Sequence, residues 1–355
     1  MRSLIIMGVV GALSCMAQEQ NAYIGTYTGS SGSKGVYRIR VDNATGVATK
    51  PELVAEVGNP SFLALDAAKH RLYAVSESAS KVFAYSIGDT ALTLLNEAKT
   101  GAGPCHVAVH VDGKLAVADY GGGSVSTWQI GSDGRIGEQT AFFQNAHASK
   151  ATSRQDKPRA HGVTFSPDGK LLLVPDLGAD RVYVYGNRDT PTAHKVAPWI
   201  ELPPGRGPRH VAFSENHLYV INELSNTVSV FGCDWGRGLF TFVEEVSTLP
   251  AGFTGESTTA ELIVTGNALY ATNRGHDSIA RFKRDSKTGR LTLMECVPCG
   301  GKWPRHFSLI PGAPWLLVAN QNSNSIAVFR VEEDGALTLK PENSIEIPAP
   351  VCVVF

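Results

Sequence analysis

The sequence carries little net charge and few charged residues. Its 355 residues include 32 Lys and Arg against 33 Asp and Glu, so the formal net charge is −1, and charged residues make up 18% of the chain. The absence of any block of like charges argues against an electrostatic surface for nucleic acid or membranes. Beyond the N-terminus, no apolar run reaches the roughly 18–20 residues that span a bilayer. We therefore expect no nucleic-acid partner and no membrane span.

The sequence also lacks the motifs of several common enzyme classes. No His, Asp or Cys set has a metal-ligand spacing, no Gly-rich loop follows a strand to cradle phosphate, and no GxSxG motif is present. We expect neither a metal nor a cofactor. A helical period and an interdomain linker are also missing, which favours a single all-β domain.

The N-terminal residues differ from the rest of the chain. Arg2 precedes an apolar stretch from Leu4 to Leu13, and small residues follow up to Ala17. This order is typical of a signal peptide, although a buried first strand is the alternative. The stretch contains glycines, and the repeats described below begin only at Ala22. We expect residues 1–17 to be a signal peptide and the protein to be exported, to a periplasm or outside the cell. A lipid anchor at Cys15 is an alternative, but the three residues before it match the sequence motif for lipid attachment poorly.

Five cysteines remain after cleavage at that point, and an odd number cannot pair completely within one chain. Cys296 and Cys299 are spaced like half of a zinc site, but no second pair follows. A local disulfide between them is an alternative in an oxidising compartment. We expect isolated thiols in the core.

Self-similar segments spaced about 45 residues apart dominate the rest of the chain, a period that indicates propeller blades. Each unit has an apolar strand, a turn, a second strand, a polar loop and a third strand, and a fourth strand follows. Turn residues such as Asp112-Gly113 and Asp168-Gly169 separate the first two strands. Full units cover residues 60–87, 103–130, 159–186, 207–232, 258–285 and 303–330.

The first unit, residues 22–57, lacks its first strand. AYIGTYT (22–28) matches a second strand and GVYRIRV (35–41) a third, while PAPVCVVF (348–355) has the pattern of a first strand. The C-terminal strand is therefore expected to complete the blade that the N-terminus begins, which removes exposed edges. The sequence predicts an all-β, seven-bladed β-propeller of four-stranded blades over residues 21–355.

Candidate site residues follow from this architecture. The start of each first strand and the end of each second strand lie at the same end of the ring, because the two strands form a hairpin. His161 and Arg274 each occur once at their blade position, and Glu223 stands in the same variable position as Arg274. Together with Arg209 they come from three consecutive blades, and we expect them to meet at the channel mouth. Such a cluster is either a mutual ion-pair network or a polar ligand site.

A histidine recurs at the neighbouring position in three blades, and the recurrence favours one shared structural role, such as holding a loop. The residues are His106, His210 and His306. We also include His210 and His306 among the candidates for substrate contact. Arg206 and Arg305 join them, because arginine suits bidentate pairing with an anionic group.

Several segments resemble the seven-bladed propeller lactonases, a family that includes one type of bacterial 6-phosphogluconolactonase and the fungal carboxymuconate lactonising enzyme. The resemblance covers essentially the whole chain after the N-terminus and is most specific in six segments. They are HGVTFSPDGKLLLVPDLGADRVYVY (161–185), GPRHVAF (207–213), VINELSNTVSV (220–230), ATNRGHDSIA (271–280), and WPRHF with VANQNSNSIAVF (303–329). The loop SRQDKPRAH (153–161) is similar too, but relatives often carry a second His where this chain has Arg159.

The resemblance implies that His161, Arg209, Glu223 and Arg274 form the active site. It implies a lactonase that hydrolyses a sugar-acid lactone without a metal, and 6-phosphogluconolactonase is the nearest label. We expect a small-molecule lactone or sugar acid as the partner, and a monomer. Either His161 or Glu223 is then the base. The alternatives are a carboxymuconate-type cycloisomerase and a non-catalytic exported propeller that binds protein or glycan. Mutual salt bridges without a pocket would favour the last of these.

The signal peptide predicts the N-terminus of the mature protein. Mass spectrometry of the protein purified from its native host is expected to show a chain that starts after Ala17, because the signal peptidase cleaves behind small residues. A mature chain that begins at Met1 would contradict export.

Overall fold

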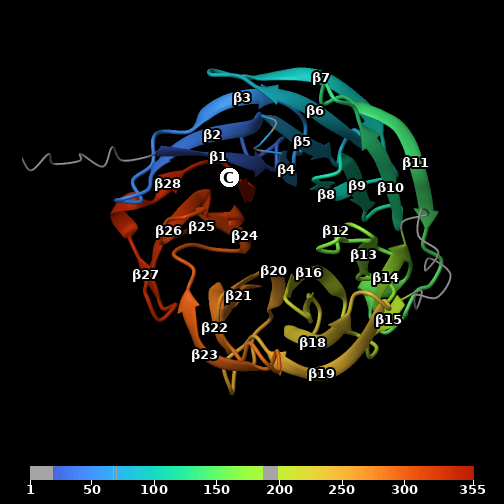
Figure 1. The fold of residues 1–355 in the computed structure, drawn as a ribbon. Helices are drawn as coiled ribbons and strands as arrows, with labels where there is room; N and C mark the ends of the chain where they lie inside the picture. Colours follow the sequence, from blue (N-terminus) through green and yellow to red (C-terminus); the bar gives the residue numbers. More distant parts are fainter. Residues whose placement is uncertain (1–18, 67, 69, 187–198) are drawn as a thin grey trace, which may run out of the picture.

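A ring of seven antiparallel sheets surrounds a central channel (Figure 1). The computed structural model describes residues 19–355 except 67, 69 and 187–198, so the predicted signal peptide and Cys15 lie outside the described residues. The ring confirms the predicted seven-bladed propeller. We number the blade that contains the first described strand as blade 1 and continue along the chain.

The strands of each blade follow one another outward from the channel. The innermost strands of blades 1 to 7 are β29 (Pro350–Val354), β4 (Leu63–Asp66), β8 (Pro104–His110), β12 (Thr164–Phe165), β16 (Pro208–Ser214), β20 (Thr258–Thr265) and β24 (Pro304–Leu309). The second strands are β1 (Glu19–Thr26), β5 (Arg71–Ser76), β9 (Lys114–Asp119), β13 (Leu171–Asp176), β17 (His217–Asn222), β21 (Ala268–Arg274) and β25 (Trp315–Asn320).

The outer half of each blade completes the sheet. The third strands are β2 (Gly35–Asp42), β6 (Lys81–Ile87), β10 (Ser124–Ile130), β14 (Arg181–Gly186), β18 (Thr227–Asp234), β22 (Ser278–Arg284) and β26 (Ser325–Val331). The fourth strands are β3 (Glu52–Glu56), β7 (Leu92–Lys99), β11 (Ile136–Gln144), β15 (Trp199–Glu201), β19 (Leu239–Ser247), β23 (Leu291–Pro298) and β27 (Leu337–Leu339). Short 3₁₀ turns are η2 (Ser153–Gln155), η3 (Gln321–Ser323) and η4 (Pro341–Asn343). No helix among the described residues is long and apolar enough to cross a membrane.

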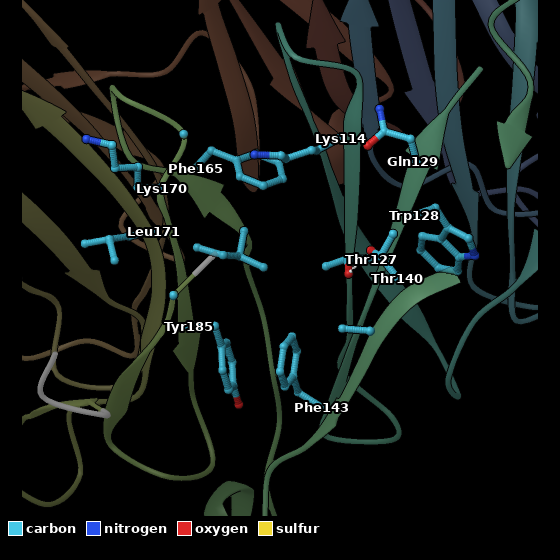
Figure 2. A pocket seen from close by; sticks show the side chains of 14 residues that line it. Lys114, Thr127, Trp128, Gln129, Thr140, Phe143, Phe165, Lys170, Leu171 and Tyr185 are labelled. Atoms are coloured by element: carbon cyan, nitrogen blue, oxygen red, sulfur yellow. Dashed lines mark hydrogen bonds between the residues drawn. The ribbon is translucent and has the colours of Figure 1, made fainter. Parts of the chain in front are cut away.

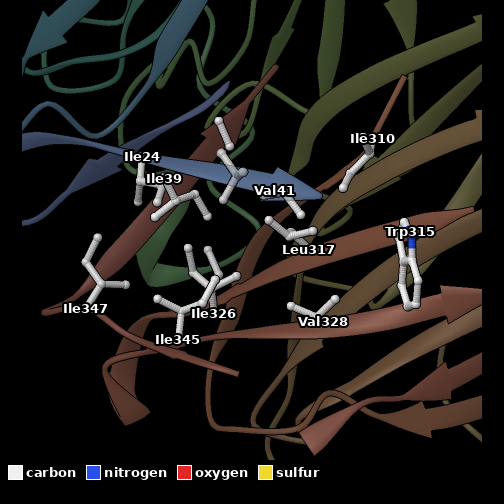
Figure 3. Packing of buried hydrophobic residues seen from close by; sticks show 13 residues of the cluster. Ile24, Ile39, Val41, Ile310, Trp315, Leu317, Ile326, Val328, Ile345 and Ile347 are labelled. Atoms are coloured by element: carbon white, nitrogen blue, oxygen red, sulfur yellow. The ribbon is translucent and has the colours of Figure 1, made fainter. Parts of the chain in front are cut away.

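The C-terminal strand closes the ring, as predicted. β29 pairs antiparallel with β1, with Tyr23 opposite Val354 and Ile24 opposite Val353. Blade 1 then packs against blade 7 through a shared apolar cluster that contains Ile24 and Ile39 of blade 1 and Leu317 and Ile326 of blade 7 (Figure 3). Closure leaves no blade edge at the junction of the two ends of the chain.

The predicted turns explain how the hairpins form. Gly113 and Gly169 adopt φ angles of 76° and 65°, values that favour glycine because it has no Cβ. At Gly169 a Cβ would also lie 2.3 Å from the His110 ring of the preceding blade. This turn therefore needs glycine both for its conformation and for the contact between blades.

Two blades depart from the regular four-strand pattern. β12 is only two residues long, because Pro175 in the facing strand β13 has no N–H to donate to it. Blade 7 has a split outer strand: β27 and β28 (Ile345–Glu346) both pair with β26, and the turn η4, which begins with a proline, separates them. Blade 7 therefore keeps the predicted four-strand order, and its fourth position is shared by the two short strands β27 and β28.

The cysteines are free thiols throughout the described part of the chain. They are Cys105, Cys233, Cys296, Cys299 and Cys352. Cys296 and Cys299 do not form the local disulfide considered as an alternative, which agrees with the expected isolated thiols.

Ring closure predicts that deletion of residues 348–355 unfolds the protein or lowers its Tm by tens of degrees. The deletion exposes the β1 edge and removes Val351, Cys352 and Val353, which are at most 1% exposed. Thermal unfolding followed by circular dichroism measures the effect. Phe355→Ala is the control, because Phe355 follows the last paired residue of β29. A deletion variant with the wild-type Tm would contradict the closure.

Candidate active site

The four predicted active-site residues, His161, Arg209, Glu223 and Arg274, meet at one end of the central channel. His161 lies just before β12, and its backbone N–H donates to the Pro175 carbonyl at 2.9 Å. Arg209 lies in β16, Glu223 directly follows β17, and Arg274 ends β21. Three consecutive blades thus supply the cluster, as the repeat alignment predicts.

The Glu223 carboxylate is the centre of this cluster. Its Oε2 lies 3.1 Å from Nε of Arg209 and 3.0 Å from Nη2 of Arg274. Its Oε1 accepts a hydrogen bond from Nη1 of Arg154, and Nε2 of His161 lies 3.8 Å from Oε2. The Glu223 side chain is only 2% exposed. Three guanidinium groups therefore surround one buried carboxylate.

Strand β20 fixes the two buried arginines. Nη1 of Arg209 donates to the Ala260 carbonyl and Nη2 of Arg274 to the Thr259 carbonyl, each at 2.6 Å. Within the described part of the chain, Nε of both arginines and Oε2 of Glu223 have no aligned hydrogen-bond partner. Buried polar atoms are normally hydrogen-bonded, so the cluster depends on the charge–charge contacts of Glu223 with Arg209 and Arg274 at these atoms.

The environment sets the charge of each group. Burial alone would raise the pKa of Glu223, but the positive charges of Arg274, Arg209 and Arg154 outweigh it and lower that pKa to about 2. Burial, followed by the charge of Arg274, lowers the pKa of Arg209 to about 10. Burial and the charge of Arg209 lower the pKa of His161 well below its ordinary value of 6.5. At pH 7 the cluster therefore holds an ionised carboxylate, charged guanidinium groups and a neutral imidazole.

These protonation states leave the cluster with an excess of positive charge. Within the described part of the chain, the ion pairs of Arg154, Arg209 and Arg274 all go to Glu223, and Glu261 is the next acidic group whose charge acts on Arg209. An ion-pair network with only a structural role would be expected to balance its buried charges, because unpaired ones are costly. The excess favours binding of an anion or of an oxygen that develops negative charge.

His161 is held in place by two neighbours on the preceding blade, blade 3. Its Nδ1 lies 3.9 Å from the Sγ atom of Cys105, and its ring meets the Tyr120 ring edge to face at 5.2 Å. The imidazole is buried in an orientation that leaves Nε2 as its closest approach to Glu223.

A second layer of side chains crosses the channel beneath the cluster. The His106 ring stacks on Phe62 at 3.9 Å and meets the His210 ring at 4.7 Å. The carboxylate of Glu261 lies 2.9 Å from Nδ1 of His210 and 3.4 Å from Nε2 of His306. The recurring histidines therefore do not share the one loop-holding role expected of them; their contacts differ from blade to blade.

The remaining candidate residues divide between the mouth and the outside. Nη2 of Arg305 donates to the Tyr27 hydroxyl at 3.0 Å, and this hydroxyl donates to Glu77 at 3.0 Å, so Arg305 lies at the mouth. Nε of Arg206 lies 2.9 Å from Glu245 on the outermost strand β19. The structure does not bring Arg206 to the cluster. His210 adjoins the cluster at two points: its Nδ1 lies 3.2 Å from Nη1 of Arg209, and its ring meets the His161 ring edge to face at 5.5 Å.

Sequence reasoning missed Arg154. It belongs to η2, in the loop between blades 3 and 4, and its Nη2 also donates to the Tyr120 hydroxyl at 2.9 Å. The loop lies outside the repeating strands, so alignment of the blades cannot place it. The only signal was its position in the segment SRQDKPRAH, which resembles the lactonases.

Cavities occur away from Glu223 as well. One of about 300 Å³ lies between blades 3 and 4, beside the stacked rings of Phe143 and Tyr185 (Figure 2). Another of about 330 Å³ lies at the far end of the channel and is lined by Glu261, His306 and Phe355. Neither cavity adjoins Glu223. Among the described residues, no group of three or more His, Cys, Asp or Glu side chains is placed to hold a metal ion.

Comparison with known proteins places this chain among the lactonases. The family model "Lactonase, 7-bladed beta-propeller" matches residues 21–355. A 6-phosphogluconolactonase of Bacillus subtilis (strain 168) is 35% identical over 345 residues, which cover 94% of this chain and 97% of that protein. The structure of the chain described here resembles that of a periplasmic gluconolactonase of Pseudomonas aeruginosa. The TM-score is 0.87 at 31% identity, and the match covers 95% of this chain and 99% of that one. A Lactobacillus plantarum protein gives a TM-score of 0.85 at 29% identity, with coverage of 95% and 99%.

The fold and the match along its length define the class of protein. This chain belongs to the seven-bladed β-propeller lactonase family.

The charge of Glu223 predicts how the stability of the protein depends on pH. Because its folded pKa of about 2 lies below the ordinary 4.5, its contribution to stability is fully present above about pH 4.5 and is lost as the pH falls toward 2. Glu223→Gln is therefore expected to lower the Tm at pH 7, and its difference from wild type is expected to shrink between pH 4.5 and 2.

Thermal unfolding at a series of pH values measures this difference. Glu295→Gln is the matched control, because Glu295 pairs with Arg281 on the outside of blade 6, where its side chain is 42% exposed. A Tm difference for Glu223→Gln that stays constant over the whole pH range would show that the carboxylate is not held ionised by the arginines.

Proposed function

We propose that this chain is a lactonase that hydrolyses a sugar-acid lactone as a monomer and without a metal, with 6-phosphogluconolactonase as its nearest label. The names of its relatives support the substrate class, since one is a 6-phosphogluconolactonase and another a gluconolactonase. Family membership favours an enzyme that acts on the carboxylic ester bond of a lactone.

The observation that carries the proposal is the neutral imidazole of His161 beside the excess positive charge around Glu223. Lactone hydrolysis needs a base for the attacking water and donors for the oxyanion that forms at the carbonyl. The cluster supplies both kinds of group, because His161, Arg209 and Arg274 all lie next to the Glu223 carboxylate. His161 is 5% exposed, Arg209 3% and Arg274 5%, so the groups are largely shielded from bulk water.

In the first step, His161 accepts a proton from water as the water oxygen attacks the carbonyl carbon. The neutral imidazole is the form that can accept this proton. Glu223 is less suited as the base, because Arg154, Arg209 and Arg274 already engage its two carboxylate oxygens. Its Oε2, 3.8 Å from Nε2 of His161, instead stabilises the imidazolium that forms.

The arginines act on the oxygen atoms of the substrate. The guanidinium groups of Arg209 and Arg274 are charged and border the same carboxylate as His161, so they suit the oxyanion of the tetrahedral intermediate. When this intermediate collapses, the bond between the carbonyl carbon and the ring oxygen breaks. The imidazolium of His161 returns its proton to that oxygen, and the open-chain hydroxy acid leaves. Arg305, His210 and His306 support the proposed site from the mouth and from the layer beneath.

A non-catalytic binding propeller is the second candidate. The mutual ion pairs around Glu223 favour it, and so do the two cavities that lie away from the cluster. The excess charge favours the enzyme instead. A carboxymuconate-type cycloisomerase would use the same residues, and muconolactone therefore belongs among the lactones to be assayed.

The proposal includes export to a periplasm, with residues 1–17 as the signal peptide. The similarity to a gluconolactonase described as periplasmic supports this compartment. Phosphorylated sugar lactones are mainly cytosolic, so an exported enzyme would meet unphosphorylated lactones.

The mechanism predicts that His161→Ala and Arg274→Ala each lower kcat at least about 100-fold while the protein stays folded. A positioned base contributes roughly 10²–10⁴-fold, and the loss of one oxyanion donor costs about 10²–10³-fold. Turnover is measured with gluconolactone, its 6-phosphate and muconolactone, against a blank without enzyme because lactones hydrolyse spontaneously.

His106→Ala is the control for His161. It removes a histidine that stacks on Phe62 in the layer beneath, so it is expected to lower the Tm more than the rate. If His161→Ala and Glu223→Gln both keep near-wild-type turnover on the preferred substrate, the assignment of the site is wrong.

A further inference from the structure

We propose that Arg154 selects lactones that carry an anionic group, a phosphate monoester or a carboxylate, away from the reacting carbonyl. This inference rests on the proposed lactonase function and concerns the same site. It assigns to Arg154 a role in specificity, separate from the roles of the buried arginines in the reaction.

Exposure distinguishes Arg154 from the other two arginines on Glu223. Its side chain is 43% exposed, against 3% for Arg209 and 5% for Arg274. It is therefore the guanidinium of the cluster that a substrate meets first. Nη1 bonds to Glu223 and Nη2 to the Tyr120 hydroxyl, which orients the group while part of it remains open to solvent.

The loop around Arg154 is fixed by hydrogen bonds to its neighbours. The Thr152 hydroxyl accepts from the Arg154 backbone N–H at 3.3 Å. The next residue, Gln155, is fully buried, and its side chain donates to the Leu177 carbonyl at 2.9 Å. Arg154 thus belongs to a positioned loop, and a positioned donor loses less entropy on binding than a mobile surface side chain.

The charge of this part of the mouth favours an anion. The loop adds Lys157, whose Nζ donates to the Gly121 carbonyl at 2.8 Å, and Arg159, which lies over the Tyr120 ring at 5.1 Å. Asp156, 2.7 Å from Arg159, offsets one of these charges. The loop therefore adds positive charge to a cluster that already has an excess.

The chemistry of arginine matches the proposed group. A guanidinium presents its donors in a planar fork that pairs with phosphate or carboxylate, and charge-assisted hydrogen bonds are about twice as strong as neutral ones. A remote group of this kind binds equally in the ground state and the transition state. Its loss should therefore raise the KM for anionic lactones more than the KM for a neutral lactone, whereas any effect of the lost contact with Glu223 falls on all lactones alike.

The test compares wild type with Arg154→Gln on three lactones: gluconolactone, which is neutral, its 6-phosphate, and glucarolactone, which carries a carboxylate. We expect wild type to have a higher kcat/KM for one of the anionic lactones than for gluconolactone. The preference is the kcat/KM for that anionic lactone divided by the kcat/KM for gluconolactone. Arg154→Gln is expected to lower this ratio about tenfold to 100-fold, mainly by raising the KM for the anionic lactone. The two anionic lactones distinguish phosphate from carboxylate as the group that is read.

Two further variants make the result specific. Arg154→Lys keeps the charge but loses the fork, and should retain part of the preference. Arg281→Gln removes an arginine paired with a glutamate on the outside of blade 6, and should leave the ratio unchanged.

Several outcomes would overturn the inference while leaving the lactonase function intact. One is that wild type prefers neither anionic lactone, and another is that the Arg154→Gln ratio stays within about twofold of wild type. The third is an equal loss of kcat on all three substrates, which would mean that the loop has only a structural role. No hydrolysis of any lactone by wild type above the blank would instead contradict the proposed function itself.

Discussion

Burial of the Glu223 carboxylate among guanidinium groups is the interaction on which the rest of the channel mouth depends. A buried ion cluster persists only when each charge has partners in good geometry. Here the partners come from separate parts of the chain: Arg209 from the same blade, Arg274 from the next, and Arg154 from the loop between blades 3 and 4. The spacing of the blades around the ring therefore decides whether the charges meet, so the fold and the site cannot vary independently.

Repetition made the fold and much of the site predictable. Seven similar units give seven similar hairpins, and the residue at one position of one hairpin indicates where its equivalents lie in the others. That rule placed His161, Glu223 and Arg274 at one end of the channel before any distance was known. It also matched the C-terminal strand to the incomplete first blade, because a propeller cannot leave one blade without its inner strand.

Features that do not repeat were beyond this reasoning. Arg154 lies in a loop with no counterpart in the other blades, and the contact of Arg206 with Glu245 depends on how its side chain leaves the backbone. The shortened β12 reflects a single missing N–H, at Pro175. The recurrence of the histidines was a misleading signal: equivalent positions in a closed ring face one another across the channel, so they contact one another and Glu261 rather than their own loops.

The pairing of β29 with β1 also fixes when the protein can be completed. β1 leaves the ribosome among the first strands, whereas its inner neighbour begins only at Pro350. At about 5–20 residues per second, the hydrogen-bonding edge of β1 waits roughly 15–65 seconds for its partner. An unpaired edge can recruit a strand from another chain. The nascent protein therefore reaches its closed form only as synthesis ends, and until then its first blade depends on being kept apart from other growing chains.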